Sequence, residues 1–180
     1  MGFTIIEVLI SIFLFGLISL VLFSVYQGYF VAFGLQQARI DTARSARTIV
    51  SEVEKVARQA NHIVVSHPFA RTTITTSTST AVFELPSVNS VGDIVANTYD
   101  YIAFYTTNAY MYELTEAGNG SIRTNGTKRL SDIINTLAFA YSNANLTQAA
   151  STSVDVRTQT IVKGSPVQAH LYQVIHLRNL

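Results

Sequence analysis

The residues best suited to metal binding are spread along the chain rather than grouped. The sequence has four histidines, His62, His67, His170 and His176, and no cysteine. If residues 167–177 form a strand, His170 and His176 share one face but lie about 20 Å apart at strand rise, too far apart to bind one metal ion. We therefore expect solvent-facing or edge histidines and no metal site. Without cysteine there are no disulfides and no thiolate metal centres.

Small polar clusters in the second half of the chain do not form a recognisable catalytic group. The stretch 118–121 (Gly-Asn-Gly-Ser) lacks the strand–turn–helix context of a nucleophile elbow and the lysine of a phosphate-binding loop. Asp93 and Asp100 lie among small polar residues, but their spacing matches no calcium-binding loop. These observations predict a protein that is not an enzyme and uses no cofactor.

Tyrosines gather in segments whose pattern is typical of strands: Tyr99, Tyr101, Tyr105, Tyr110, Tyr112 and Tyr141. Such rings could form an adhesive surface or stack on the bases of single-stranded nucleic acid. Base stacking normally accompanies a basic groove, whereas only Arg123, Lys128 and Arg129 lie nearby and the net charge is +1. We favour cross-strand tyrosine pairs that support a sheet and expect no nucleic-acid partner.

Glu7 is the only charged residue between Phe3 and Phe33, where almost every side chain is apolar, small or hydroxylic. A carboxylate inside a hydrocarbon layer is costly, so an intramembrane charge indicates a function. A secretory signal peptide would have a shorter apolar run followed by a small-residue cleavage site, and no such site follows here. An ordinary membrane anchor remains an alternative, and it leaves Glu7 unexplained.

The order of residues around Glu7 resembles the prepilin processing motif of type IV pilin-like proteins. In residues 2–10, Gly-Phe-Thr-Ile-Ile-Glu-Val-Leu-Ile, a glycine precedes an aromatic residue and a glutamate lies four residues beyond that residue. The resemblance implies that a prepilin peptidase cuts between Gly2 and Phe3, and that Phe3 becomes a methylated N-terminus. It also implies that Glu7 offsets the amino terminus of a neighbouring subunit during assembly, because a buried carboxylate and a buried ammonium are tolerable only as a pair.

Two features depart from the family pattern. Only Met1 precedes Gly2, and no basic residue precedes the apolar run, so we expect that a longer basic leader belongs at this end. The first proline is Pro68, so the family's frequent mid-helix proline is absent. Any kink in the apolar helix would depend on weaker helix breakers, namely Gly16, Gly28 and Gly34.

The helical pattern continues beyond the apolar run. Between Leu35 and Ala60 apolar residues recur three and four apart, with charged residues on the other face and Glu54 and Arg58 spaced for an ion pair. From Phe3 to about Ala60 we predict one helix roughly 85 Å long. We divide the chain into a residual leader (1–2), a transmembrane or assembly helix (3–34), an amphipathic helix (35–60) and a β-rich head (61–180).

Beyond Asn61 the pattern changes to the period of two that is typical of strands. Strands are predicted at 63–65, 81–85, 99–105, 110–114, 136–141, 154–162 and 167–177, with turns at Thr107-Asn108 and at 163–166. The Thr- and Ser-rich stretch 72–80 is predicted to be a loop or an edge strand. The predicted fold class is α+β: a long N-terminal helix packed on an antiparallel β-sheet head.

The order of segments in the second half, with Leu177-Arg178-Asn179 near its end, resembles J-type minor pseudopilins and related minor pilins. The expected function is that of a structural minor pilin-like subunit, held in the cytoplasmic membrane by one span with its head outside the cytoplasm. Its expected partners are the prepilin peptidase, other pilin or pseudopilin subunits and an assembly platform. The alternatives are a minor pseudopilin of type II secretion, a DNA-uptake or adhesive pilin, and a plain single-span surface protein.

Overall fold

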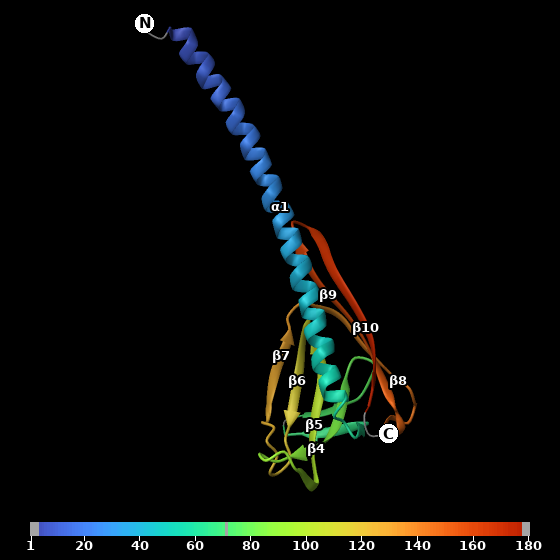
Figure 1. Ribbon diagram of the computed structural model, residues 1–180. Helices are drawn as coiled ribbons and strands as arrows, with labels where there is room; N and C mark the ends of the chain where they lie inside the picture. The colour runs from blue at the N-terminus through green and yellow to red at the C-terminus, as the bar shows by residue number, and fades with distance from the viewer. Residues whose placement is uncertain (1–3, 71, 178–180) are drawn as a thin grey trace. The chain divides into compact units, whose positions relative to one another are not determined.

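The computed structural model describes residues 4–70 and 72–177. The chain divides into two compact units, one ending at Ala38 and one running from Arg39 onward. The long helix α1, Ile5–Ala57, supplies all of the regular structure in the first unit and the only α-helix among the described residues of the second (Figure 1). The α+β class predicted from the sequence is confirmed.

In the first unit, α1 is built from residues that favour helix in an apolar setting. Leucine, isoleucine and phenylalanine dominate, and no proline interrupts the backbone ladder. The helix is continuous through Gly16, Gly28 and Gly34. An added Cβ at Gly16 or Gly28 would meet nothing within 4 Å, so close packing does not explain these two glycines.

In the second unit, α1 is amphipathic as predicted. Its buried residues include Ala46, Ile49, Val50, Val53, Val56 and Ala57. Glu54 pairs with Arg58 at 2.6 Å on the exposed side. The helix ends at Ala57, three residues earlier than predicted, and a turn follows in which the Ala60 N–H donates to the carbonyl of Ala57.

The larger sheet is antiparallel, with the strand order β1-β4-β5-β6-β7. Its strands are β1 (His62–Ile63), β4 (Ala81–Val88), β5 (Ile94–Thr107), β6 (Tyr110–Glu116) and β7 (Gly126–Ser131). Asn108 and Ala109, both at positive φ, form the two-residue turn between β5 and β6, one residue beyond the predicted turn. Both flanking strands extend past their predicted ends.

A second antiparallel sheet has the order β10-β9-β8, with β8 (Ile134–Tyr141), β9 (Ser151–Val162) and β10 (Ser165–His176). Lys163 and Gly164, at φ 48° and 81°, make the predicted turn of the β9–β10 hairpin. A separate two-stranded sheet joins β2 (Ser66–Phe69) to β3 (Thr72–Thr75), so the start of the Thr- and Ser-rich stretch is a strand. The predicted strand at 63–65 is wrong in extent, because pairing as β1 ends at Ile63.

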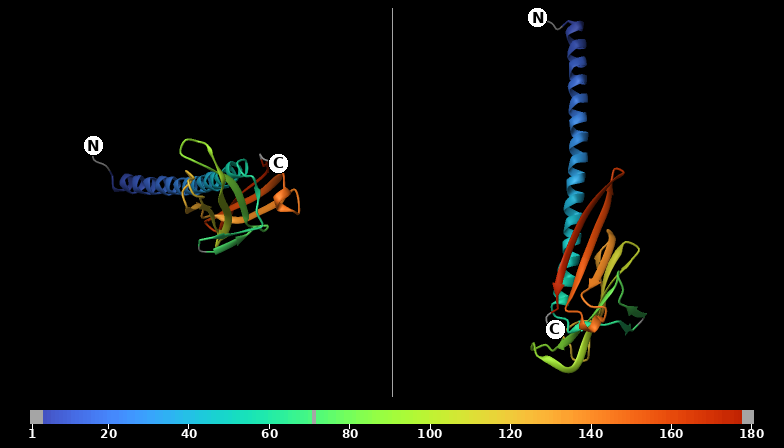
Figure 2. Two further views of the ribbon diagram at one scale, coloured as in Figure 1. Left: turned by 90° about the horizontal axis from the view of Figure 1, so that it is seen from below. Right: turned by 90° about the vertical axis from the view of Figure 1, so that its right-hand side faces the viewer.

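In the second unit α1 runs alongside the strands of both large sheets (Figure 2), and one hydrophobic core joins the helix to them. It contains Ile49 and Val53 of α1, Phe83 and Phe104 of the larger sheet, and Val156 of the smaller one, all of them fully or almost fully buried. A much smaller cluster, Phe69, Val82 and Ala103, lies on the other side of the larger sheet. The larger sheet therefore has an inner face toward α1 and an outer face that the β2–β3 hairpin partly covers.

Candidate functional site

The described part of the first unit presents a largely apolar surface. Apart from Val31, which is half-buried, the large apolar side chains from Ile5 to Phe33 are each between 45% and 83% exposed. This part of α1 is long and apolar enough to cross a membrane, and it is about 43 Å long at helical rise, longer than a hydrocarbon core of about 30 Å. The helix is compatible with a single-pass membrane protein.

Glu7 is engaged with the first turn of its own helix. Its Oε2 atom accepts hydrogen bonds from the backbone N–H and the hydroxyl of Thr4, each at 2.9 Å. The Thr4 hydroxyl in turn accepts from the backbone N–H of Glu7 at 3.4 Å. This reciprocal arrangement of an N-cap threonine and a glutamate three residues later is a capping box, which satisfies donors that a helix N-terminus leaves unpaired.

The capping box gives Glu7 a local role that we did not predict from the sequence. The signal was present, because Thr4 and Glu7 have the Thr-x-x-Glu spacing immediately before an apolar run. The pair leaves other acceptor sites on the carboxylate, since an ionised carboxyl group has about four lone-pair positions. Gly2 and Phe3, the predicted processing residues, lie outside the described residues.

The histidines occupy three kinds of environment. His170 and His176 are exposed on β10, as predicted, and the His170 ring lies 3.0 Å from an oxygen of Asp155. His62 lies 3.6 Å from Glu84. His67 lies on β2, an edge strand of the two-stranded sheet, which fits the prediction of an edge histidine. Its side chain is 15% exposed and stacks on Tyr101, with ring centroids 3.6 Å apart. Within residues 4–70 and 72–177, no group of three metal-binding side chains could hold an ion.

Asp100 is the centre of a buried polar network rather than a calcium ligand. Its carboxylate accepts from Ser87 Oγ at 2.7 Å, from the backbone N–H of Gly118 at 2.7 Å and from Ser121 Oγ at 2.8 Å. The Arg123 guanidinium forms an ion pair with the same carboxylate and also donates to the Pro86 carbonyl and to Gln59. The stretch 118–121 is thus a structural loop around a buried charge.

The electrostatic balance at Asp100 favours the ionised form. Burial acts to raise the pKa of this carboxyl group, but the hydrogen bonds from Ser87, Arg123, Gly118 and Ser121 together outweigh it, so the pKa is lowered. The network ties β4, β5, the 118–123 loop and the residues just after α1 to one another. It stabilises the fold.

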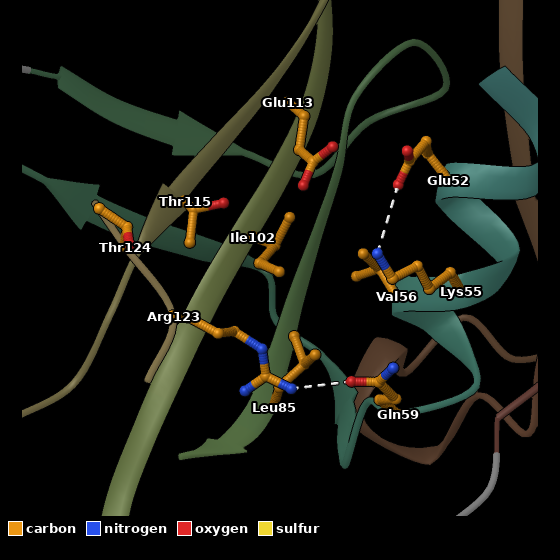
Figure 3. A pocket seen from close by; sticks show the side chains of 10 residues that line it. All are labelled: Glu52, Lys55, Val56, Gln59, Leu85, Ile102, Glu113, Thr115, Arg123 and Thr124. Atoms are coloured by element: carbon orange, nitrogen blue, oxygen red, sulfur yellow. Dashed lines mark hydrogen bonds and ion pairs between the residues drawn. The ribbon is translucent and has the colours of Figure 1, made fainter. Parts of the chain in front are cut away.

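A second charged group lies on the inner face, in a cleft of about 240 Å³ between the end of α1 and the larger sheet (Figure 3). Glu113 points into this cleft from β6, and its Oε2 atom is buried without a hydrogen-bond partner. Lys128 bonds Glu52 of α1 at 2.8 Å and is 4.0 Å from Glu113. Burial raises the pKa of Glu113, and the nearby Lys128 only partly offsets that effect.

The tyrosines lie mainly on the outer face of the larger sheet. Tyr105 and Tyr112 face each other across β5 and β6, with stacked rings 5.6 Å apart, as predicted for cross-strand pairs. Arg129 lies over the ring of Tyr110, 5.4 Å from its centroid. Of the three nearby cations, Arg123 is bound to Asp100 and Lys128 to Glu52 on the inner face, so only Arg129 shares the tyrosine face.

Comparison with known proteins identifies no relative. No protein-family model matches the chain, no curated protein matches it, and no solved structure resembles it closely enough to count as a match.

Proposed function

We propose that the chain is a structural subunit of a type IV pilin-like filament. The observation that carries the proposal is the exposed apolar helix of the first unit, which has one charged residue, Glu7, in its first turn. A helix with this surface needs a hydrocarbon environment or the apolar faces of other helices. A filament core built from many copies of such helices would bury these apolar side chains and would give the Glu7 carboxylate a partner of opposite charge.

The proposed assembly step uses the chemistry of Glu7. Cleavage after Gly2 creates an ammonium group at Phe3, and in an apolar filament core that group requires a counter-charge. The Glu7 carboxylate of the adjacent subunit supplies it. The bonds from Thr4 satisfy part of the carboxylate before assembly and hold it at the helix N-terminus, where the helix dipole also favours a negative charge.

The rest of the proposal follows from this role. A prepilin peptidase processes the subunit, the cytoplasmic membrane stores it with the head outside, and an assembly platform adds it to the filament or to its tip complex. The subunit itself catalyses no reaction. A minor pseudopilin of a type II secretion filament would use the same helix and the same charge, and the second half of the sequence resembles that subgroup.

Processing is the direct test. The chain should be extended with a basic leader, co-expressed with a prepilin peptidase and examined by intact-mass spectrometry. The expected product begins at Phe3, with or without one added methyl group. A Gly2→Leu precursor is the matched control and should remain uncut. A product that retains residues upstream of Phe3, or one cut near residue 30, would contradict the proposal.

The capping box favours one other function, a plain single-span surface protein in which Glu7 only caps its helix. The two functions differ in their response to Glu7→Gln. Glutamine keeps the capping geometry but removes the charge, so an anchor should tolerate it, whereas a filament subunit should lose incorporation. Cell fractionation measures insertion, and shearing of surface filaments measures incorporation. Wild-type incorporation of the Glu7→Gln chain would favour the anchor.

A further inference from the structure

The outer face of the larger sheet carries a row of tyrosine rings. Tyr105 of β5 stacks on Tyr112 of β6, and Tyr112 lies 6.3 Å from Tyr110 on the same strand. Tyr110 is 37% exposed, and Tyr105 and Tyr112 are half-buried, so solvent reaches the row. The hydrophobic core lies behind the opposite face, and these rings are not part of it.

A groove of about 610 Å³ adjoins this row. Its apolar lining includes Phe69 of β2, Tyr105 and Leu114. The volume lies within the range of about 300–1,000 Å³ that is usual for small-molecule sites. Because Tyr105 belongs both to the groove and to the tyrosine row, the two form one continuous surface.

Apart from Glu116, the polar side chains of the described groove lining are neutral hydrogen-bonding groups. They include the hydroxyls of Thr72 and Thr127 and the side-chain amide of Asn125, whose Oδ1 accepts from the Ala117 N–H and is thereby held in orientation. Glu116 is the one formally charged residue among the described lining residues, and an oxygen of its carboxylate lies 3.6 Å from His67. The described lining contains no lysine or arginine.

We propose that this surface binds a neutral saccharide. A sugar ring has an apolar C–H face that packs on a tyrosine ring, and its hydroxyls both donate and accept hydrogen bonds. Threonine hydroxyls do the same, and the asparagine amide provides both donors and an acceptor. Tyrosine combines a large apolar face with a polar end, which suits a ligand that is amphipathic in this way.

The charges of the described lining residues do not favour the main competing ligand, single-stranded nucleic acid. A strand of nucleic acid needs cations along its phosphates, and the groove instead presents the carboxylate of Glu116. Arg129 lies against Tyr110 at the far end of the row, and Lys128 faces the inner side, where it bonds Glu52. A neutral ligand would meet no charge repulsion from the described side chains of this surface.

Saturation-transfer NMR on the full chain in micelles tests the proposal. The detergent must be zwitterionic, because a sugar-headed detergent would compete for the site. The probes are maltotriose, cellotetraose, chitotriose and mannotriose at millimolar concentrations, with sialyllactose and oligothymidine as anionic comparisons. We expect at least one neutral probe to bind and the anionic probes not to bind.

Variants locate the binding. Tyr112→Ala should weaken it by roughly two- to tenfold, as expected for the loss of one stacked ring, and Tyr112→Phe should retain it. Tyr172→Ala is the matched control, because Tyr172 is 57% exposed on β10 of the other sheet. Thr127→Arg alters the groove at an exposed position and should abolish binding even if Tyr112→Ala folds poorly.

The proposal is overturned if no neutral saccharide binds, if the anionic probes bind better, or if Tyr112→Ala and Thr127→Arg both bind like the unmodified chain. The inference does not depend on the assembly role of Glu7. The two experiments therefore have independent outcomes: saccharide binding can fail while processing after Gly2 succeeds, and processing can fail while saccharide binding succeeds.

Discussion

Replacing Arg123 with methionine should strongly destabilise the head. The Asp100 side chain is 0% exposed and the Arg123 side chain 21% exposed. Methionine keeps most of the apolar stem of arginine but removes the guanidinium, which leaves a buried carboxylate with bonds from Ser87, Gly118 and Ser121 only. Removing one partner of a buried ion pair costs about 3–5 kcal/mol, so we expect a loss of that size in the free energy of unfolding.

The converse change should cost less. In Asp100→Asn the amide can still accept hydrogen bonds, and the partly exposed guanidinium of Arg123 can turn to water, so the expected loss is about 1–3 kcal/mol. Because the two side chains share one interaction, the double variant should lose less than the sum of the single variants. Arg157→Met is the matched control, since Arg157 forms only an exposed pair with Asp155, and it should cost at most about 1 kcal/mol.

The assay is denaturant unfolding of the full chain in micelles, followed by near-ultraviolet circular dichroism of tyrosine, since the chain has no tryptophan. The pKa of Asp100 is lower in the folded state, so its ionised form stabilises the fold above the unfolded pKa and this contribution is lost as pH falls through the folded pKa. The deficit of Asp100→Asn should therefore shrink below about pH 4. If Arg123→Met unfolds within about 1 kcal/mol of the unmodified chain, the reasoning is wrong.

Three other changes give further tests. Gly118→Ala should destabilise the head by about 1–3 kcal/mol in the same assay, because the added Cβ would lie 2.5 Å from Thr98 Cγ2 and 2.7 Å from the Tyr99 carbonyl oxygen. Gly126→Ala is the control and should be nearly neutral, since a Cβ there would meet nothing within 4 Å. Glu113→Gln should stabilise the head at neutral pH, because the raised pKa of Glu113 shows that its ionised form is unfavourable in the folded state. In the unmodified chain the stability should decrease as pH rises through the folded pKa of Glu113, and the variant should not show this decrease. Thr4→Val should leave membrane insertion unchanged but increase amide hydrogen exchange in the first turn of α1, and unchanged exchange would rule out the capping box.

The elements that the sequence predicts well are those set by local pattern. The apolar run and the three-and-four spacing after Leu35 predict α1 to within a few residues at each end. Alternation and turn residues predict β9 and β10 and the turn at Lys163–Gly164. These features depend on residues that are close in the sequence, so they can be predicted without knowledge of the fold.

The features that the sequence does not predict depend on pairs far apart in the chain. No local pattern places Arg123 beside Asp100, or stacks His67 on Tyr101. The division of the strands into two large sheets, with β8 pairing β9 and not β7, is also a long-range choice. That the tyrosine row is exposed could be inferred only from the orientation of β6, in which Met111 lies in the core with α1 and Glu113 points into the cleft beside α1.

Some contacts between α1 and the last strands of the head join residues far apart in the sequence, so they can form only late in folding. The Thr158 hydroxyl donates to the carbonyl of Thr42 across 116 positions, and Gln173 donates to Glu54 across 119. Contacts this far apart in sequence make folding slow, because a long loop must close before they are gained. The buried stripe of α1 leaves the ribosome early, yet it lacks its last partners until β10 has been synthesised. A nascent chain that stops before Ser151 would therefore leave part of that stripe exposed, and exposed apolar surface favours aggregation and chaperone binding.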